Sequence, residues 1–154
     1  MARIRKILVP VDFSESSREA LAYAAELAQK FGARIDLLHV WQAPVFIPTA
    51  TLPEVPNVDA NIVDLVRQNA EEATARALAE ARAQGLPVES ARAEPGVPAR
   101  GIVELAKADG YDLIVIGTHG RTGLSRAMMG SVAEKVVRLA PCPVLTVRSA
   151  ADEA

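Results

Sequence analysis

The sequence predicts an α/β fold: a doubly wound, Rossmann-like parallel sheet of five strands in the order 3-2-1-4-5, with four helices. Two observations predict it. Several short segments are apolar at nearly every position, which is typical of strands buried on both faces of a parallel sheet. Segments with helical periodicity alternate with them, so that successive strands are joined by helices. Right-handed crossovers of such βαβ units give the doubly wound arrangement.

The expected strands are short and rich in aliphatic residues. They cover residues 5–11, 34–40, 86–93, 111–117 and 143–148. The segment 86–93 has the weakest pattern and is expected at an edge of the sheet. The segment 143–148 comes last and is expected at the opposite edge.

The expected helices carry apolar residues at helical spacing and stop at glycine or proline. They cover residues 16–31, about 59–84, 97–110 and about 131 to just before Pro141. Gly32 and Gly85 end the first two helices, as glycine commonly does. Pro98 stands in the first turn of the third helix, where a missing N–H leaves no bond unmade.

Composition limits the classes of protein that remain. A chain of 154 residues that is 50% hydrophobic can bury one core, so we expect one domain over residues 1–148 and a tail over 149–154. With 17 basic and 19 acidic residues the net charge is -2, which gives no footprint for nucleic acid or an anionic membrane. One cysteine, Cys142, excludes an internal disulfide. No signal-type or membrane-spanning apolar run is visible, so a cytoplasmic protein is expected.

The connection over residues 41–58 is long and contains four prolines. Connections of this length are usually functional or disordered. A lid or subunit contact, a flexible excursion and a residual strand all stay open. Trp41 is expected in this exposed loop, packed on its own subunit.

Two polar segments are expected to meet at the carboxyl ends of the strands. In an open α/β sheet a ligand binds where the winding reverses, which here lies between the first and fourth strands. The first strand ends in PVDFS, residues 10–14, and the fourth in IGTHG, residues 116–120. Gly117 and Gly120 are expected to permit positive φ angles and to remove side chains that would hold a ligand away, so that backbone N–H groups can line an anion-binding nest. Gly130 and Ser131 begin a helix whose positive dipole end also favours an anion. Phosphate is the expected ligand.

A structural alternative exists for the same residues. Ser131 followed by Glu134 has the spacing of a capping box, which would satisfy the helix start internally. The sequence contains neither G-x-x-x-x-G-K-[ST] nor G-x-G-x-x-G. Without a P-loop lysine, efficient phosphoryl transfer is not expected.

The glycine spacing resembles a known signature. Gly117, Gly120, Gly130 and Ser131 match G-x2-G-x9-G-[ST], which is similar to the motif of the nucleotide-binding branch of the universal stress proteins. The resemblance continues through four segments: ILVPVDFSESSREAL (7–21), LLHV (37–40), YDLIVIGTHGRTGL (111–124) and GSVAEKVVRLAPCPVLTV (130–147).

The resemblance implies a small homodimeric regulatory protein that binds ATP, ADP or AMP in this crevice. It implies that Asp12 and the backbone of Val40 contact adenine, although Asp12 could also cap the first helix or its turn. The residues implied beside the ribose are Pro10, Val11 and Gly117, with Ile116 next to them, and those implied at the phosphates are Gly120, Gly130, Ser131 and Val132. His119 and Arg121 stand inside the motif and are implied near the phosphates.

Any Mg²⁺ is expected to be carried by the phosphates. His39 is expected to be a satisfied core histidine rather than a ligand contact.

Three functions follow as alternatives. The first is a stress-response regulator whose nucleotide state is read by an unknown protein partner. The second is a weak ATPase or phosphotransferase using the same pocket, although no residue is an obvious general base, and an enzyme is not expected. The third is a non-binding dimerisation module. In each, the last strand would form the dimer contact, through Val144, Leu145, Thr146 and Val147.

Overall fold

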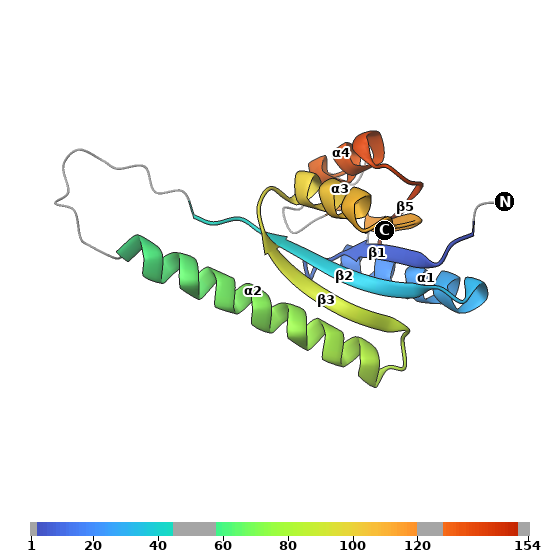
Figure 1. The fold of residues 1–154 in the computed structure, drawn as a ribbon, viewed down its shortest axis with the longest axis horizontal. Helices are drawn as coiled ribbons and strands as arrows, with labels where there is room; N and C mark the ends of the chain where they lie inside the picture. The colour runs from blue at the N-terminus through green and yellow to red at the C-terminus, as the bar shows by residue number, and fades with distance from the viewer. Residues whose placement is uncertain (1–2, 45–57, 120–127, 151–154) are drawn as a thin grey trace.

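The computed structural model describes residues 3–44, 58–119 and 128–150. Its five strands form one parallel sheet in the order β3-β2-β1-β4-β5, which confirms the predicted order (Figure 1). The strands are β1 (Lys6–Pro10), β2 (Arg34–Trp41), β3 (Val88–Pro95), β4 (Leu113–Gly117) and β5 (Val144–Val147).

Four helices cover the two faces of the sheet. They are α1 (Glu15–Phe31), α2 (Val58–Ala83), α3 (Pro98–Ala108) and α4 (Ser131–Leu139). Helices α1 and α2 pack on one face, and α3 and α4 pack together on the other (Figure 1). The winding therefore reverses between the adjacent strands β1 and β4.

The sheet separates two hydrophobic cores. In β1, Ile7 and Val9 face the core under α1 and α2, while Leu8 between them faces the core under α3 and α4. All three are fully buried. Because both faces of the central strands are covered, these strands have apolar residues at successive positions rather than alternating ones.

Several element boundaries differ from expectation by one or two residues, and those of β3 and β2 bear on the site. Strand β3 begins two residues later than predicted and runs on to Pro95. Trp41 is not in an exposed loop: it is the last residue of β2, pairs with Pro95 and is only 7% exposed. The prediction was wrong because β2 continues along β3, and Gly96 N donates to Trp41 O at 2.9 Å. Residues 45–57 of the long connection lie outside the described residues, so the alternatives for that part stay open.

A polar cluster lies near the amino-terminal ends of the strands, at the opposite end of the sheet from their carboxyl ends. Asp36 of β2 accepts from Tyr111 Oη at 2.9 Å and from Ser90 Oγ at 2.6 Å. Burial, with help from the Asp36 carboxylate, raises the pKa of Tyr111 above its usual range. The hydroxyl therefore remains a donor, and the cluster links β2, β3 and the start of β4.

The first two residues of the expected tail lie on α1. Ser149 Oγ donates to Glu19 Oε1 at 3.2 Å, and Ala150 N donates to both Glu19 carboxylate oxygens. Ser149 is buried. Among the helices of the described ranges, none is both long and apolar enough to cross a membrane.

Candidate functional site

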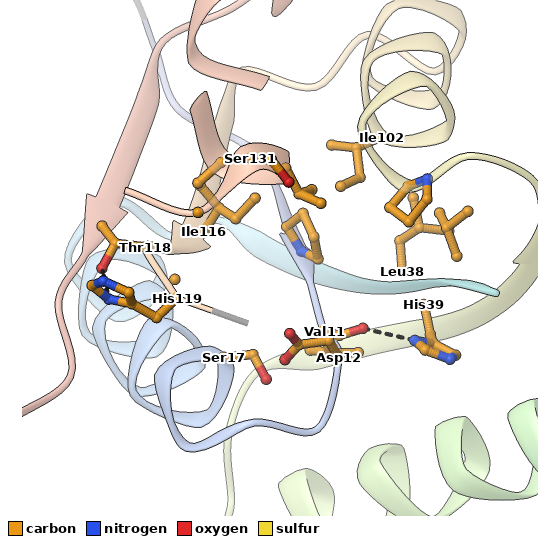
Figure 2. A pocket seen from close by; sticks show the side chains of 17 residues that line it. Val11, Asp12, Ser17, Leu38, His39, Ile102, Ile116, Thr118, His119 and Ser131 are labelled. Carbon is orange, nitrogen blue, oxygen red and sulfur yellow. Dashed lines mark hydrogen bonds between the residues drawn. The ribbon is translucent and has the colours of Figure 1, made fainter. Parts of the chain in front are cut away.

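A cavity of about 270 Å³ opens at the carboxyl ends of β1, β2 and β4. Figure 2 shows Ser131 and Ile102 on one side of it and Asp12 and Ser17 across from them. Ten of the twelve predicted site residues line the cavity: Pro10, Val11, Asp12, Val40, Ile116, Gly117, His119, Gly130, Ser131 and Val132. The other two, Gly120 and Arg121, lie outside the described residues. The structure thus brings together segments that are separated by about a hundred positions in the sequence.

Asp12 stands at the corner where β1 leads into α1. Its Oδ1 accepts from Ser14 N at 2.9 Å, which closes a turn of the Asx type. Ser14, not Asp12, is the N-cap of α1 and accepts from Ser17 N at 3.2 Å. The alternative role of Asp12 is therefore wrong for the helix, which Ser14 caps, and confirmed for the turn before it. Asp12 Oδ2 has no hydrogen-bond partner among the described residues, and Asp12 lines the cavity.

Phe13, the next residue, has a φ of 64°. Left-handed backbone costs a non-glycine residue roughly 1–2 kcal/mol, so the surroundings must hold it in place. The Asp12–Ser14 hydrogen bond spans Phe13 on the backbone side. On the other side its ring packs against the His39 ring, with centroids 4.6 Å apart and planes tilted by 51°.

His39 is a satisfied histidine, as expected. Its Nδ1 lies 2.9 Å from Val11 O (Figure 2). A carbonyl oxygen can only accept, so Nδ1 carries the proton of this bond. His39 also lines the cavity, where it was not expected as a ligand contact.

Gly117 is a glycine for a reason that differs from the expected one. It is not among the residues with positive φ, so the predicted left-handed conformation at Gly117 is wrong. A Cβ at this position would instead come within 2.8 Å of the backbone C and O atoms of Ser16. His119 N donates to Ser16 Oγ at 3.4 Å beside it. The glycine thus lets the end of β4 lie directly against the first turn of α1.

The start of α4 also differs from the capping-box alternative. The N-cap is Gly130, with φ -58° and ψ 151°, and no side chain caps the helix. Ser131 is the first helical residue, one position too late to cap it. Gly130 N donates to Thr118 O at 2.6 Å, which ties the helix start to the end of β4. Among the described residues, no side chain accepts from the N–H groups of the first turn of α4, and the dipole of the helix makes this end partly positive.

The lining has two chemically distinct parts. Its walls are mostly aliphatic and come from β1, β2, α3, β4 and α4: Pro10, Leu38, Val40, Ile102, Ile116 and Val132. Its polar groups include the Asp12 carboxylate near α1 and the start of α4 with the Ser131 hydroxyl, together with the side chains of Ser17, His39, Thr118 and His119. Such a cavity suits a ligand that combines a flat, largely apolar ring system with an anionic group.

Several lining residues were not predicted from the sequence. They are Ser17, Leu38, His39, Pro98, Ile102, Thr118 and Ala133. Leu38 could have been found, because it pairs with Pro10 and precedes Val40 by two positions on the same strand face. Pro98 and Ile102 could not, because only the crossing of α3 over the sheet places them beside β2.

The family follows from comparison with known proteins. The universal stress protein family is matched over residues 3–148. The chain belongs to the universal stress protein family. Among its relatives, universal stress protein MJ0531 of Methanocaldococcus jannaschii is 37% identical, over 97% of this chain and 85% of that protein. Universal stress protein YxiE of Bacillus subtilis is 36% identical, over 93% of this chain and 98% of that protein.

Solved structures of universal stress proteins share the fold. Universal stress protein UspA from Lactobacillus plantarum superposes with a TM-score of 0.75 at 30% identity, over 96% of this chain and all of that one. A family protein from Arabidopsis thaliana with AMP bound has a TM-score of 0.65 at 23% identity, over 97% of this chain and 94% of that one. A universal stress protein in complex with cAMP has a TM-score of 0.61 at 24% identity, over 96% of this chain and 99% of that one. At these last two identities the likeness is one of fold.

Proposed function

We propose that this chain binds an adenine nucleotide, ATP, ADP or AMP, in the cavity between β1 and β4 and acts as a regulatory protein. The observation that carries the proposal is the convergence of Asp12, Val40, Gly117 and the Gly130–Ser131 helix start on one cavity. The aliphatic walls would hold the base and ribose. The uncapped start of α4 would hold phosphate.

Two universal stress proteins with this fold were solved with adenine nucleotides, one with AMP and one with cAMP. They support the class of ligand. Which of AMP, ADP and ATP this chain binds most tightly is to be measured with the protein itself.

Thermal unfolding with added nucleotide tests the proposal. A ligand at about a hundred times its Kd adds about 2.7 kcal/mol to stability. For a domain of this size the expected rise in Tm is roughly 5–10 °C. AMP, ADP and ATP are compared with cytidine nucleotides and with inorganic phosphate. A Tm that does not move with any adenine nucleotide, together with no heat of binding in calorimetry, contradicts the proposal and favours the non-binding dimerisation module.

The proposed role is binding rather than catalysis. The lining residues that the structure describes include no lysine or arginine to neutralise a transferring phosphoryl group. Ser17 Oγ donates to Ser14 O at 3.0 Å and is thereby engaged in the helix start. Phosphate release from ATP that scales with protein concentration, and that is lost in a non-binding variant, would replace this proposal with the weak ATPase.

Mg²⁺, where present, would be carried by the phosphates. The only carboxylate among the described lining residues is Asp12, which lies across the cavity from the α4 start. One carboxylate does not make a magnesium site of its own. We expect Mg²⁺ to change the affinity for ATP and to leave that for AMP unchanged, as calorimetry with and without a chelator would show.

We also propose that the protein is a homodimer paired through β5. This strand is an edge of the sheet, and Leu145 on it is exposed. Val137 and Leu139 of the adjacent α4 are exposed as well, at 46% and 60%. An uncovered apolar edge favours pairing with a second copy about a two-fold axis. Light scattering should give twice the chain mass of 16.4 kDa, and a single-chain mass at all concentrations contradicts the dimer.

A further inference from the structure

The hydrogen-bond ladder between β1 and β2 stops where the cavity begins. Its last bond runs from Val11 N to Leu38 O at 2.9 Å. In a regular parallel pair, each residue that donates in this way also accepts from the partner two residues further along. The next bond of the ladder would therefore join Val40 N to Val11 O.

His39 takes the place of that bond. Within the described residues, no hydrogen bond joins Val40 N to Val11 O, and the carbonyl instead accepts from His39 Nδ1 at 2.9 Å. The neutral ring with its proton on Nδ1 and the doubly protonated ring can both donate this bond. The imidazole thus occupies the acceptor that would continue the ladder.

The periodicity of β2 determines where the Val40 backbone points. Residues two apart on a strand direct their N–H and C=O groups to the same side. Since Leu38 O points toward β1, the N–H of Val40 points toward the same side, beyond the place where the chain turns from β1 into α1. Val40 lines the cavity at this point.

The turn away from β1 is held by the same histidine. The Phe13 ring packs on the imidazole at 4.6 Å, and Phe13 has the left-handed backbone that redirects the chain into α1. Figure 2 shows His39 beside Val11, on the opposite side of Val11 from Ser17. One side chain therefore ends the ladder and supports the corner that opens the cavity.

We infer that His39 is a positioning residue that keeps the Val40 N–H free to donate to the base of the bound nucleotide. The exposure of the N–H is a property of the unliganded chain, whereas its use by a base rests on the proposed function. Two experimental arms separate these parts.

The first arm measures hydrogen exchange of the Val40 amide without nucleotide. His39→Leu keeps a side chain of moderate size but has no hydrogen-bond donor. Val11 O then becomes available to Val40 N. His39→Asn keeps an N–H donor on the atom attached to Cγ, where Nδ1 stands in histidine. We expect fast exchange of Val40 in the wild type and in His39→Asn, and slowed exchange in His39→Leu.

Tyr111→Phe is the matched control. It removes a buried hydrogen bond to Asp36 at the other end of β2 and should leave Val40 exchange fast. Slow exchange of Val40 in the wild type, or equal rates in wild type and His39→Leu, would overturn the inference whether or not nucleotide binds.

The second arm measures AMP affinity by calorimetry. We expect His39→Leu to lose about tenfold or more in affinity and His39→Asn to stay within about threefold of the wild type. Full affinity in His39→Leu would overturn the role of the Val40 N–H in binding. If the wild type binds no adenine nucleotide, the proposed function fails while the exchange arm still decides the role of His39 in the free protein.

Discussion

At the scale of the residue, Asp12 combines a structural hydrogen bond with a place in the lining of the candidate site. Its Oδ1 closes the turn to Ser14, which leaves Oδ2 without a hydrogen-bond partner among the described residues. Sequence alone predicted that Asp12 belongs to the site. It could not separate ligand contact from helix capping, since both use a carboxylate at the same position, and only the hydrogen bond from Ser17 N to Ser14 decides that Ser14 is the cap.

Asp12→Asn tests this division of tasks. Asparagine keeps the Oδ1 acceptor for Ser14 N and removes the charge. We expect stability within about 0.5 kcal/mol of the wild type and a loss of about tenfold in nucleotide affinity. Asp12→Ala, which also loses the turn, should cost about 1 kcal/mol of stability besides. Chemical denaturation and calorimetry measure the two quantities, and unchanged affinity in Asp12→Asn would remove the carboxylate from the site.

Gly117 shows why a motif can be recognised for the wrong physical reason. The spacing marked it as a ligand-binding glycine with positive φ, whereas the structure requires it for the close approach of Ser16. Spacing in a sequence reports that a Cβ is absent. It does not report which neighbour would collide with one.

Gly117→Ala should therefore destabilise the fold through overpacking, by about 1–3 kcal/mol in denaturant unfolding. Gly85 is the matched control, because it has a φ of 73° and no atom within 4 Å of an added Cβ. Gly85→Ala should cost about 1 kcal/mol from backbone strain alone and leave nucleotide binding intact. A Gly117→Ala protein as stable as the wild type would contradict the close contact with Ser16.

At the scale of the element, α4 starts without a cap at the place where the ligand is expected. The capping box of Ser131 and Glu134 was a reasonable alternative from spacing, but the helix begins one residue too early for it. The dihedral angles of Gly130 lie in the extended region that ordinary capping residues adopt. A capping side chain would therefore fit, and glycine leaves the first amides available.

Gly130→Asp and Gly130→Ser test this arrangement. Either side chain can cap α4, and we expect each to raise stability by a few tenths of a kcal/mol. Both should weaken nucleotide binding by occupying the amides, and Asp more strongly, by about tenfold or more, because its charge also repels phosphate. Equal nucleotide affinity in wild type and Gly130→Asp would show that phosphate does not lie at this helix end.

Strand β5 carries the prediction of the dimer. Leu145 is the exposed apolar residue of this edge. Leu145→Lys places a charge on the edge and should give a monomer by light scattering without loss of the fold, since an edge lysine discourages strand pairing. A variant that remains dimeric would move the subunit contact to another surface.

At the scale of the whole molecule, the order of elements and the sheet topology followed from the sequence, because apolar strands, helical periodicity and right-handed crossovers leave few alternatives. The location of the site followed from the same topology, at the reversal between β1 and β4. The contribution of α3 did not, since Pro98 and Ile102 reach the cavity only through the crossing of that helix over β2. The role of His39 was also missed, because the ladder bond that it replaces exists only in the folded pair of strands.

Binding of an adenine nucleotide between β1 and β4 can be tested by titrating isotopically labelled protein with AMP and following its backbone amide signals. We expect saturable changes at Asp12, Val40, Gly117, Gly130 and Ser131, with little change around Tyr111 at the far end of the sheet. No saturable change at these amides, or changes confined to another surface, would contradict it.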